Sequence, residues 1–119
     1  MRSLALHIAC EIHPLNNLRV LQTLKRDFGL DEAATRRWYV HWIAVGFAAL
    51  EARLATSPGR FCHGDAPGLA DICLVPQLFN ARRFDCDLTP YPRMLEIESA
   101  CQALPPFADA HPSRQPDAE

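Results

Sequence analysis

Apolar residues recur at helical spacing along almost the whole chain. Residues 3–12 place an apolar side chain at every fourth position, so these side chains form one stripe along a helix. The pattern resumes over residues 15–28 after an interruption at Pro14, and it fades at Gly29, a residue type that commonly ends helices. No segment of useful length alternates between apolar and polar positions. The sequence therefore predicts an all-α protein.

The longest predicted helix begins after Asp31 and runs to about Ala55. Asp31 can cap this helix, because an aspartate side chain accepts a hydrogen bond from a free backbone N–H of the first turn. Two apolar stripes follow the helix: Tyr39, Ile43, Phe47, Leu50 and Leu54 form the first, and Trp38, Trp42, Val45 and Ala49 form the second. A helix that is apolar on two sides is typical of the centre of a bundle.

Two more helices are predicted in the second half of the chain. One begins near Gly68 and contains Pro76, so a bend is expected inside it. The other covers about residues 93–103 and is expected to stop at Pro105-Pro106. The segment 111–116 is expected to be extended. Together the segments predict a bundle of about five helices.

Composition narrows the class of protein further. A chain of 119 residues with 49% hydrophobic and 22% charged residues fits one globular domain, residues 1–119. The formal net charge of -2 argues against a protein that mainly binds nucleic acid or an anionic membrane. Five cysteines without a C-x-x-C pair favour a reducing compartment, and we expect a cytoplasmic protein. No apolar run approaches the length of a membrane span.

A metal site is the first candidate for chemistry near the N-terminus. His7, Cys10 and Glu11 share a helix face, and His13 follows them. Structural zinc sites usually show two clear pairs of ligands, which this arrangement lacks. We therefore predict no metal site.

The densest polar cluster follows the interruption at Pro14 and contains His13, Asn16, Asn17 and Arg19. A helix that restarts here exposes backbone N–H groups, which attract anions, and Arg19 would lie beside them. The alternative is that Asn16 only caps the new helix and that Arg19 is solvated.

A second polar cluster, residues 80–85 (NARRFD), lies near the end of the helix that contains Pro76 and includes Arg82 and Arg83. Arginines at this position stabilise the negative end of the helix dipole. They can also bind a carboxylate through the planar guanidinium group. The residue types alone leave both interpretations open.

Gly68 and Asp71 have the spacing of an N-terminal capping box. The Asp71 carboxylate can accept the backbone N–H of Gly68, but glycine has no side chain to return the bond, so the box is half present. We interpret this pair as part of the folding machinery.

Four segments together resemble a known family. They are residues 12–21 (IHPLNNLRVL), 64–77 (GDAPGLADICLVPQ), 80–84 (NARRF) and 111–117 (HPSRQPD). In this order they resemble the helical C-terminal domain of zeta-class glutathione transferases, the group that includes the maleylacetoacetate and maleylpyruvate isomerases. The resemblance covers essentially the whole chain.

The resemblance implies a glutathione-dependent cis–trans isomerase of a small dicarboxylic oxo acid, in the catabolism of tyrosine or other aromatic compounds. Glutathione would be the cosubstrate. Its binding residues in this chain would be His13, Asn17, Leu18 and Arg19, while Arg19 and Arg83 would bind substrate carboxylates. No catalytic residue is assigned within the chain.

The sequence also departs from the family. We expect the N-terminal thioredoxin-like domain, which activates the glutathione thiol in the family, to be missing from this chain. We also expect the first helix to be truncated at its N-terminus, because it starts without a clear cap. The full-length family implies a homodimer. The alternative function is a non-catalytic helical module for interaction or assembly, because a fold alone does not fix an activity.

Overall fold

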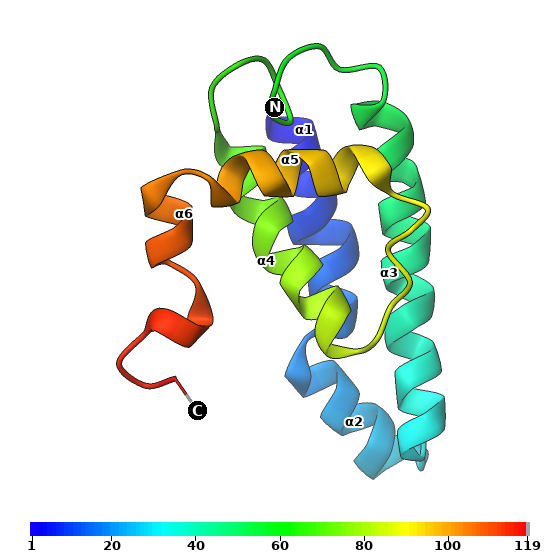
Figure 1. The fold of residues 1–119 in the computed structure, drawn as a ribbon. Coiled ribbons are helices and arrows are strands. Elements are labelled where there is room, and N and C mark those ends of the chain that lie inside the picture. The colour runs from blue at the N-terminus through cyan, green and yellow to red at the C-terminus, as the bar shows by residue number, and fades with distance from the viewer. Residues whose placement is uncertain (119) are drawn as a thin grey trace.

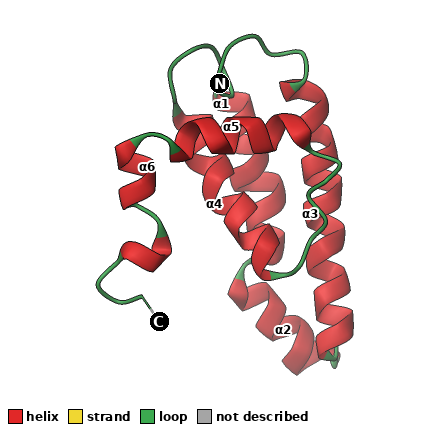
Figure 2. Cartoon of the chain, in the orientation of Figure 1, coloured by secondary structure: helices red, strands yellow, loops and turns green. Residues whose placement is uncertain are grey.

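The computed structural model describes residues 1–118, and all regular elements in that range are helical (Figures 1 and 2). The elements are α1 (Arg2–Leu6), the π-helical η1 (His7–Ile12), the 3-10 turn η2 (His13–Asn16), α2 (Leu18–Phe28), α3 (Glu32–Leu54), α4 (Leu69–Arg83), α5 (Pro92–Gln102), α6 (Pro105–Asp109) and the 3-10 turn η3 (Pro112–Arg114). The predicted all-α bundle is confirmed.

The long helix α3 and the continuous stretch α1–η1 lie side by side, and α4 packs against α1 and η1. Helix α5 crosses over α4 and reaches α3, so it closes one end of the bundle (Figure 1). Helix α6 and the C-terminal segment extend away from this core, with α6 in contact with α5. The molecule is therefore a packed helical bundle with residues 105–118 at its side, and we call these residues the C-terminal arm.

The first apolar stripe of α3 forms the centre of the core. All five of its predicted members, Tyr39, Ile43, Phe47, Leu50 and Leu54, are buried. The second stripe differs from the prediction: Trp38 and Trp42 are half-buried, but Val45 and Ala49 are exposed. Near Trp38 this flank of α3 contacts η2, where the indole Nε1 donates to the carbonyl oxygen of Leu15 at 2.8 Å.

Most predicted helix ends are confirmed by their local chemistry. Gly29 has the left-handed conformation (φ 71°) and follows the last residue of α2. The Asp31 carboxylate accepts the backbone N–H of Ala34 at 2.7 Å and caps α3. Pro76 lies inside α4 without ending it. Local side-chain chemistry therefore fixes the ends of α2 and α3.

The N-terminal helical stretch is more irregular than predicted. Its hydrogen bonding widens to a π-helix over η1 and tightens to a 3-10 turn over η2. The break predicted near His13 falls later, at Asn17, whose backbone is extended (ψ 145°). Pro14 occupies an early position of η2, and the helical path continues past it as a 3-10 turn.

The expectations for the C-terminal segment were right in one place and wrong in another. Helix α5 ends at Gln102, before Pro105-Pro106 as predicted, and the two prolines begin the separate short helix α6, since proline fits the first turn of a helix. The segment 111–116 is not fully extended, because residues Pro112–Arg114 form η3. The His111 ring Nδ1 accepts the backbone N–H of Ser113 at 3.2 Å and stabilises this turn.

The N-terminus of α5 is capped by a residue distant in the sequence. Glu51 of α3 accepts the backbone N–H of Arg93 at 2.8 Å through Oε1 and that of Met94 at 3.0 Å through Oε2. The residue before α5, Tyr91, supplies no side-chain cap. Glu51 therefore joins α3 to α5 and satisfies two N–H groups that the helix itself cannot.

We expect Gly46→Ala to lower the free energy of unfolding by about 1 to 2 kcal/mol. A β-carbon on Gly46 would lie 2.4 Å from Cδ1 and Cγ1 of Ile12, a fully buried side chain of η1. Overpacking at this contact outweighs the better helix propensity of alanine. Chemical denaturation measures the change, and Ala48→Gly on the exposed face of α3 is a control for propensity alone. Unchanged or raised stability of Gly46→Ala would contradict the close packing of η1 on α3.

Candidate functional site

The first part of the site is the turn between η2 and α2. Asn17 is the N-cap of α2, and its side-chain Oδ1 accepts the backbone N–H of Arg19 at 3.1 Å. The suggested cap, Asn16, was the wrong residue of the pair. Asn16 is buried, and its Nδ2 donates to the carbonyl oxygen of Tyr39 at 3.1 Å. The extended backbone required of an N-cap occurs at Asn17.

The side chains that surround this turn are open to solvent. His13 and Arg19 are exposed, Asn17 is half-buried, and Leu18 is 67% exposed. Among the described residues, Arg19 forms no ion pair. An exposed leucine beside a helix N-terminus and an unpaired arginine is a surface that a partly apolar anion can contact.

The second part of the site is the C-terminal turn of α4, where the structure separates two neighbouring arginines. Arg82 donates to both carboxylate oxygens of the buried Glu98 of α5, at 2.6 and 2.5 Å. This hydrogen-bonded carboxylate raises the pKa of Arg82 above its ordinary value. Within the described residues Arg83 has no ion-pair partner. Of the two residues, Arg83 is therefore the one free to bind an anion.

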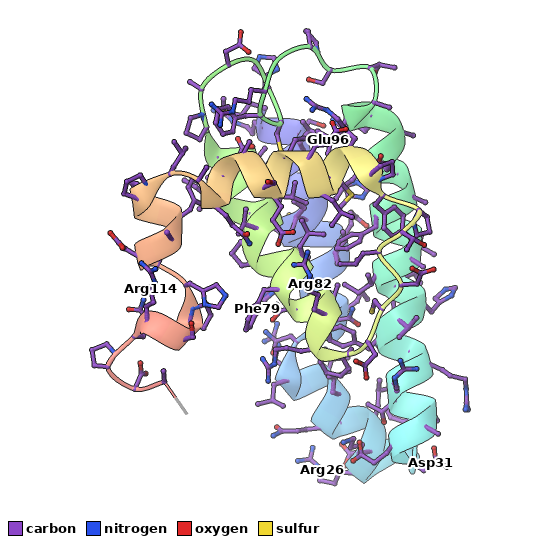
Figure 3. The ribbon with its side chains drawn as sticks, in the orientation of Figure 1. Arg26, Asp31, Phe79, Arg82, Glu96 and Arg114 are labelled. Carbon is purple, nitrogen blue, oxygen red and sulfur yellow. The ribbon has the colours of Figure 1, made fainter. Side chains whose placement is uncertain are left out.

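Two cavities meet at Arg83. A groove of about 470 Å³ lies between α2, the start of α3 and the end of α4, and Leu18, Phe84 and Arg83 are among its lining residues. A hollow of about 1350 Å³ lies between α4, α5 and the C-terminal arm. Figure 3 shows Phe79 of α4 pointing toward the arm, where its ring packs edge-on against His111 at 5.5 Å between ring centres. Arg83 lines both spaces.

The structure brings together only some of the residues predicted for the site. Leu18 and Arg83 line the same groove although they are far apart in the sequence. His13, Asn17 and Arg19 line neither cavity. Arg19 directly follows Leu18, which lines the groove. The C-terminal arm, which also lines the hollow, was not predicted to border the site, because nothing in its local pattern indicates its contact with α4.

Asp71 is 1% exposed and lies at the N-terminus of α4, on a different part of that helix from Arg83. Its Oδ2 accepts the backbone N–H of Gly68 at 2.8 Å, and its Oδ1 accepts that of Cys62 at 2.9 Å. The carboxylate thus joins the loop before α4 to the helix itself. This geometry stabilises the fold and contacts no cavity.

The buried cysteines are unsuited to nucleophilic chemistry. Burial, with the negative charge of Asp71 as a second cause, raises the pKa of Cys62 far above its ordinary value and that of Cys101 to about 12. Both thiols therefore stay protonated at neutral pH. Within residues 1–118 no group of three His, Cys, Asp or Glu side chains could hold a metal ion.

Comparison with known proteins shows the family to which the chain belongs. Residues 43–110 match the family described as "Glutathione S-transferase, C-terminal domain". The chain therefore belongs to the glutathione S-transferase family and corresponds to the helical C-terminal part of its members.

Solved structures indicate the zeta class within that family. The chain is 50% identical to a bacterial maleylpyruvate isomerase described as a zeta-class glutathione S-transferase, with a TM-score of 0.96, over 99% of this chain and 57% of that one. A maleylpyruvate isomerase from Pseudomonas aeruginosa is 52% identical, with a TM-score of 0.95, over 99% of this chain and 62% of that one. The resemblance to zeta-class transferases is confirmed.

Curated relatives carry the names of two isomerases. A probable maleylacetoacetate isomerase from Vibrio cholerae is 48% identical over 99% of this chain and 55% of its own length. The maleylpyruvate isomerase of a Ralstonia species is 50% identical over 98% of this chain and 56% of its own length. The chain thus spans about half the length of the curated relatives it matches.

Proposed function

We propose that this chain is the substrate-side domain of a glutathione-dependent cis–trans isomerase that acts on maleylacetoacetate or maleylpyruvate. The observation that carries the proposal is the unpaired Arg83, which lies in one groove with Leu18 of the α2 turn while its neighbour Arg82 is held by Glu98. The names of the relatives support the reaction. Solved relatives with bound glutathione and with bound malonate support the two ligand types.

We assign two roles to the site residues. His13, Asn17, Leu18 and Arg19 bind glutathione at the α2 turn, where helix N–H groups favour its carboxylates. Arg19 and Arg83 bind the carboxylates of the substrate, because guanidinium groups form charge-assisted, bidentate hydrogen bonds with them.

In the proposed reaction the glutathione thiolate adds to the conjugated double bond of the cis substrate. The electron pair moves to the oxo group as an enolate, the former double bond rotates as a single bond, and elimination of the thiolate restores the double bond in the trans form. The cationic residues of this chain stabilise the carboxylates and the developing enolate. Activation of the thiol is assigned to a thioredoxin-like domain outside this chain.

The apolar outer face of α4 supports the proposal that a second domain covers this helix. Leu69 and Ile72 are 52% and 59% exposed, and Ile72 lines the hollow beside the C-terminal arm. Exposed apolar residues that gather on one face indicate a contact surface. We assign this face to the thioredoxin-like domain, and we expect the complete protein to be a homodimer. The alternative function, a non-catalytic interaction module, would use the same face for another partner.

We place the protein in the cytoplasm. Its five cysteines are free thiols, as is usual in a reducing compartment. Within the described part of the chain, no helix combines the length and the apolar character needed to cross a membrane.

The ligand assignment can be tested on the chain itself. We expect glutathione to perturb the backbone amide resonances of residues 13–19 saturably, and malonate to perturb those near Arg83 in the same way. Acetate, which has one carboxylate, is the matched control and should bind more weakly. A folded chain that shows no saturable shift with either ligand would favour the interaction module instead.

A further inference from the structure

The two arginines assigned to substrate carboxylates come from segments far apart in the sequence. Both segments contact Tyr39 of α3. Arg19 belongs to the α2 turn, and Arg83 to the last turn of α4. Tyr39 is buried between these two segments. Its main chain contacts one of them and its ring contacts the other.

The main-chain contact holds the α2 turn. The Tyr39 carbonyl oxygen accepts a hydrogen bond from Nδ2 of the buried Asn16 at 3.1 Å, and the preceding residue, Trp38, donates to the carbonyl oxygen of Leu15. These two bonds run in opposite directions between α3 and η2. They fix the end of η2 at Asn16, directly before Asn17, the N-cap of α2.

The ring contact holds the end of α4. The Tyr39 ring stacks on Phe84 with 3.6 Å between ring centres and an interplanar angle of 6°. Phe84 directly follows Arg83 and is the C-cap of α4. Burial raises the pKa of Tyr39, and the positive charge of Arg83 opposes that shift.

We propose that Tyr39 is a positioning residue that sets the separation between Arg19 and Arg83, acting through Asn16 on one side and Phe84 on the other. It lines neither cavity and is not assigned a contact with substrate. The inference rests on the proposed function, because it assumes that these two arginines bind the two ends of one dicarboxylate. Two cations at a fixed separation favour a dicarboxylate of matching length.

The test is calorimetric titration of the folded chain with malonate, succinate, glutarate and acetate. Tyr39→Leu removes the stack, and we expect it to lower affinity for the best-bound dicarboxylate about tenfold while leaving acetate within about twofold. Tyr39→Phe keeps the ring and is expected to retain the affinity and the length preference. The matched control for lost core packing is Phe47→Leu, because Phe47 is a buried residue of α3, like Tyr39, and its ring packs edge-on against Tyr91.

Two outcomes would overturn the proposal and can be told apart. If Arg19→Ala and Arg83→Ala bind the dicarboxylates as the unaltered chain does, the carboxylate site fails, and the role of Tyr39 fails with it. If the arginine variants lose affinity but folded Tyr39→Leu keeps both affinity and length preference, only the positioning role is wrong. An equal loss for acetate and dicarboxylates in Tyr39→Leu would also contradict it, because that result indicates general damage.

Discussion

Replacing Asp71 by alanine is expected to lower the free energy of unfolding by about 3 kcal/mol. The carboxylate is fully buried and accepts the backbone N–H groups of Cys62 and Gly68. Its loss leaves the buried N–H of Cys62 and the half-buried N–H of Gly68 without this partner, and it removes the anchor of the loop before α4. Chemical denaturation monitored by circular dichroism measures the change.

Asp71→Asn is the matched control for this prediction. Asparagine keeps one acceptor oxygen in nearly the same shape, so we expect a loss smaller than that of Asp71→Ala. Malonate binding by either variant, measured well below its unfolding transition, should equal that of the unaltered chain. An Asp71→Ala chain with unchanged stability and lost malonate binding would show that Asp71 belongs to the site instead.

Arg83→Ala is expected to weaken malonate binding about thirtyfold without lowering stability, because one charge-assisted, bidentate contact contributes about 2 kcal/mol. Within the described residues Arg83 has no ion-pair partner. Its removal therefore breaks no ion pair of the fold. Calorimetric titration measures the affinity.

Two other arginines provide the controls for Arg83. Arg37→Ala removes the same charge from an exposed position that lines neither cavity, so it should leave affinity unchanged. Arg82→Ala leaves the buried carboxylate of Glu98 without its partner and should lower stability. Equal malonate affinity in Arg83→Ala and Arg37→Ala would remove Arg83 from the site.

The features that could be predicted from the sequence are those governed by near neighbours along the chain. The Asp31 cap and the helix stop at Gly29 depend on residues within one turn, and both are present. The main apolar stripe of α3 is buried because the helical repeat itself places its members on one face.

The features that could not be predicted depend on contacts between distant segments. Glu51 caps α5 from another helix, and the Arg82–Glu98 pair decides which of two adjacent arginines is free. Asn16 and Asn17 are equally good caps by residue type. The contact of Asn16 with the Tyr39 carbonyl, which no local pattern indicates, leaves the capping role to Asn17.

We propose that this chain supplies the substrate side of a glutathione-dependent isomerase. The most direct measurement is the rate of glutathione-dependent isomerisation of maleylpyruvate by the chain with a zeta-class thioredoxin-like domain joined ahead of Met1. We expect a rate well above that of glutathione alone, and a kcat/KM that falls about thirtyfold in the Arg83→Ala fusion. A folded fusion that binds glutathione but leaves the rate at the glutathione background would contradict the proposed function.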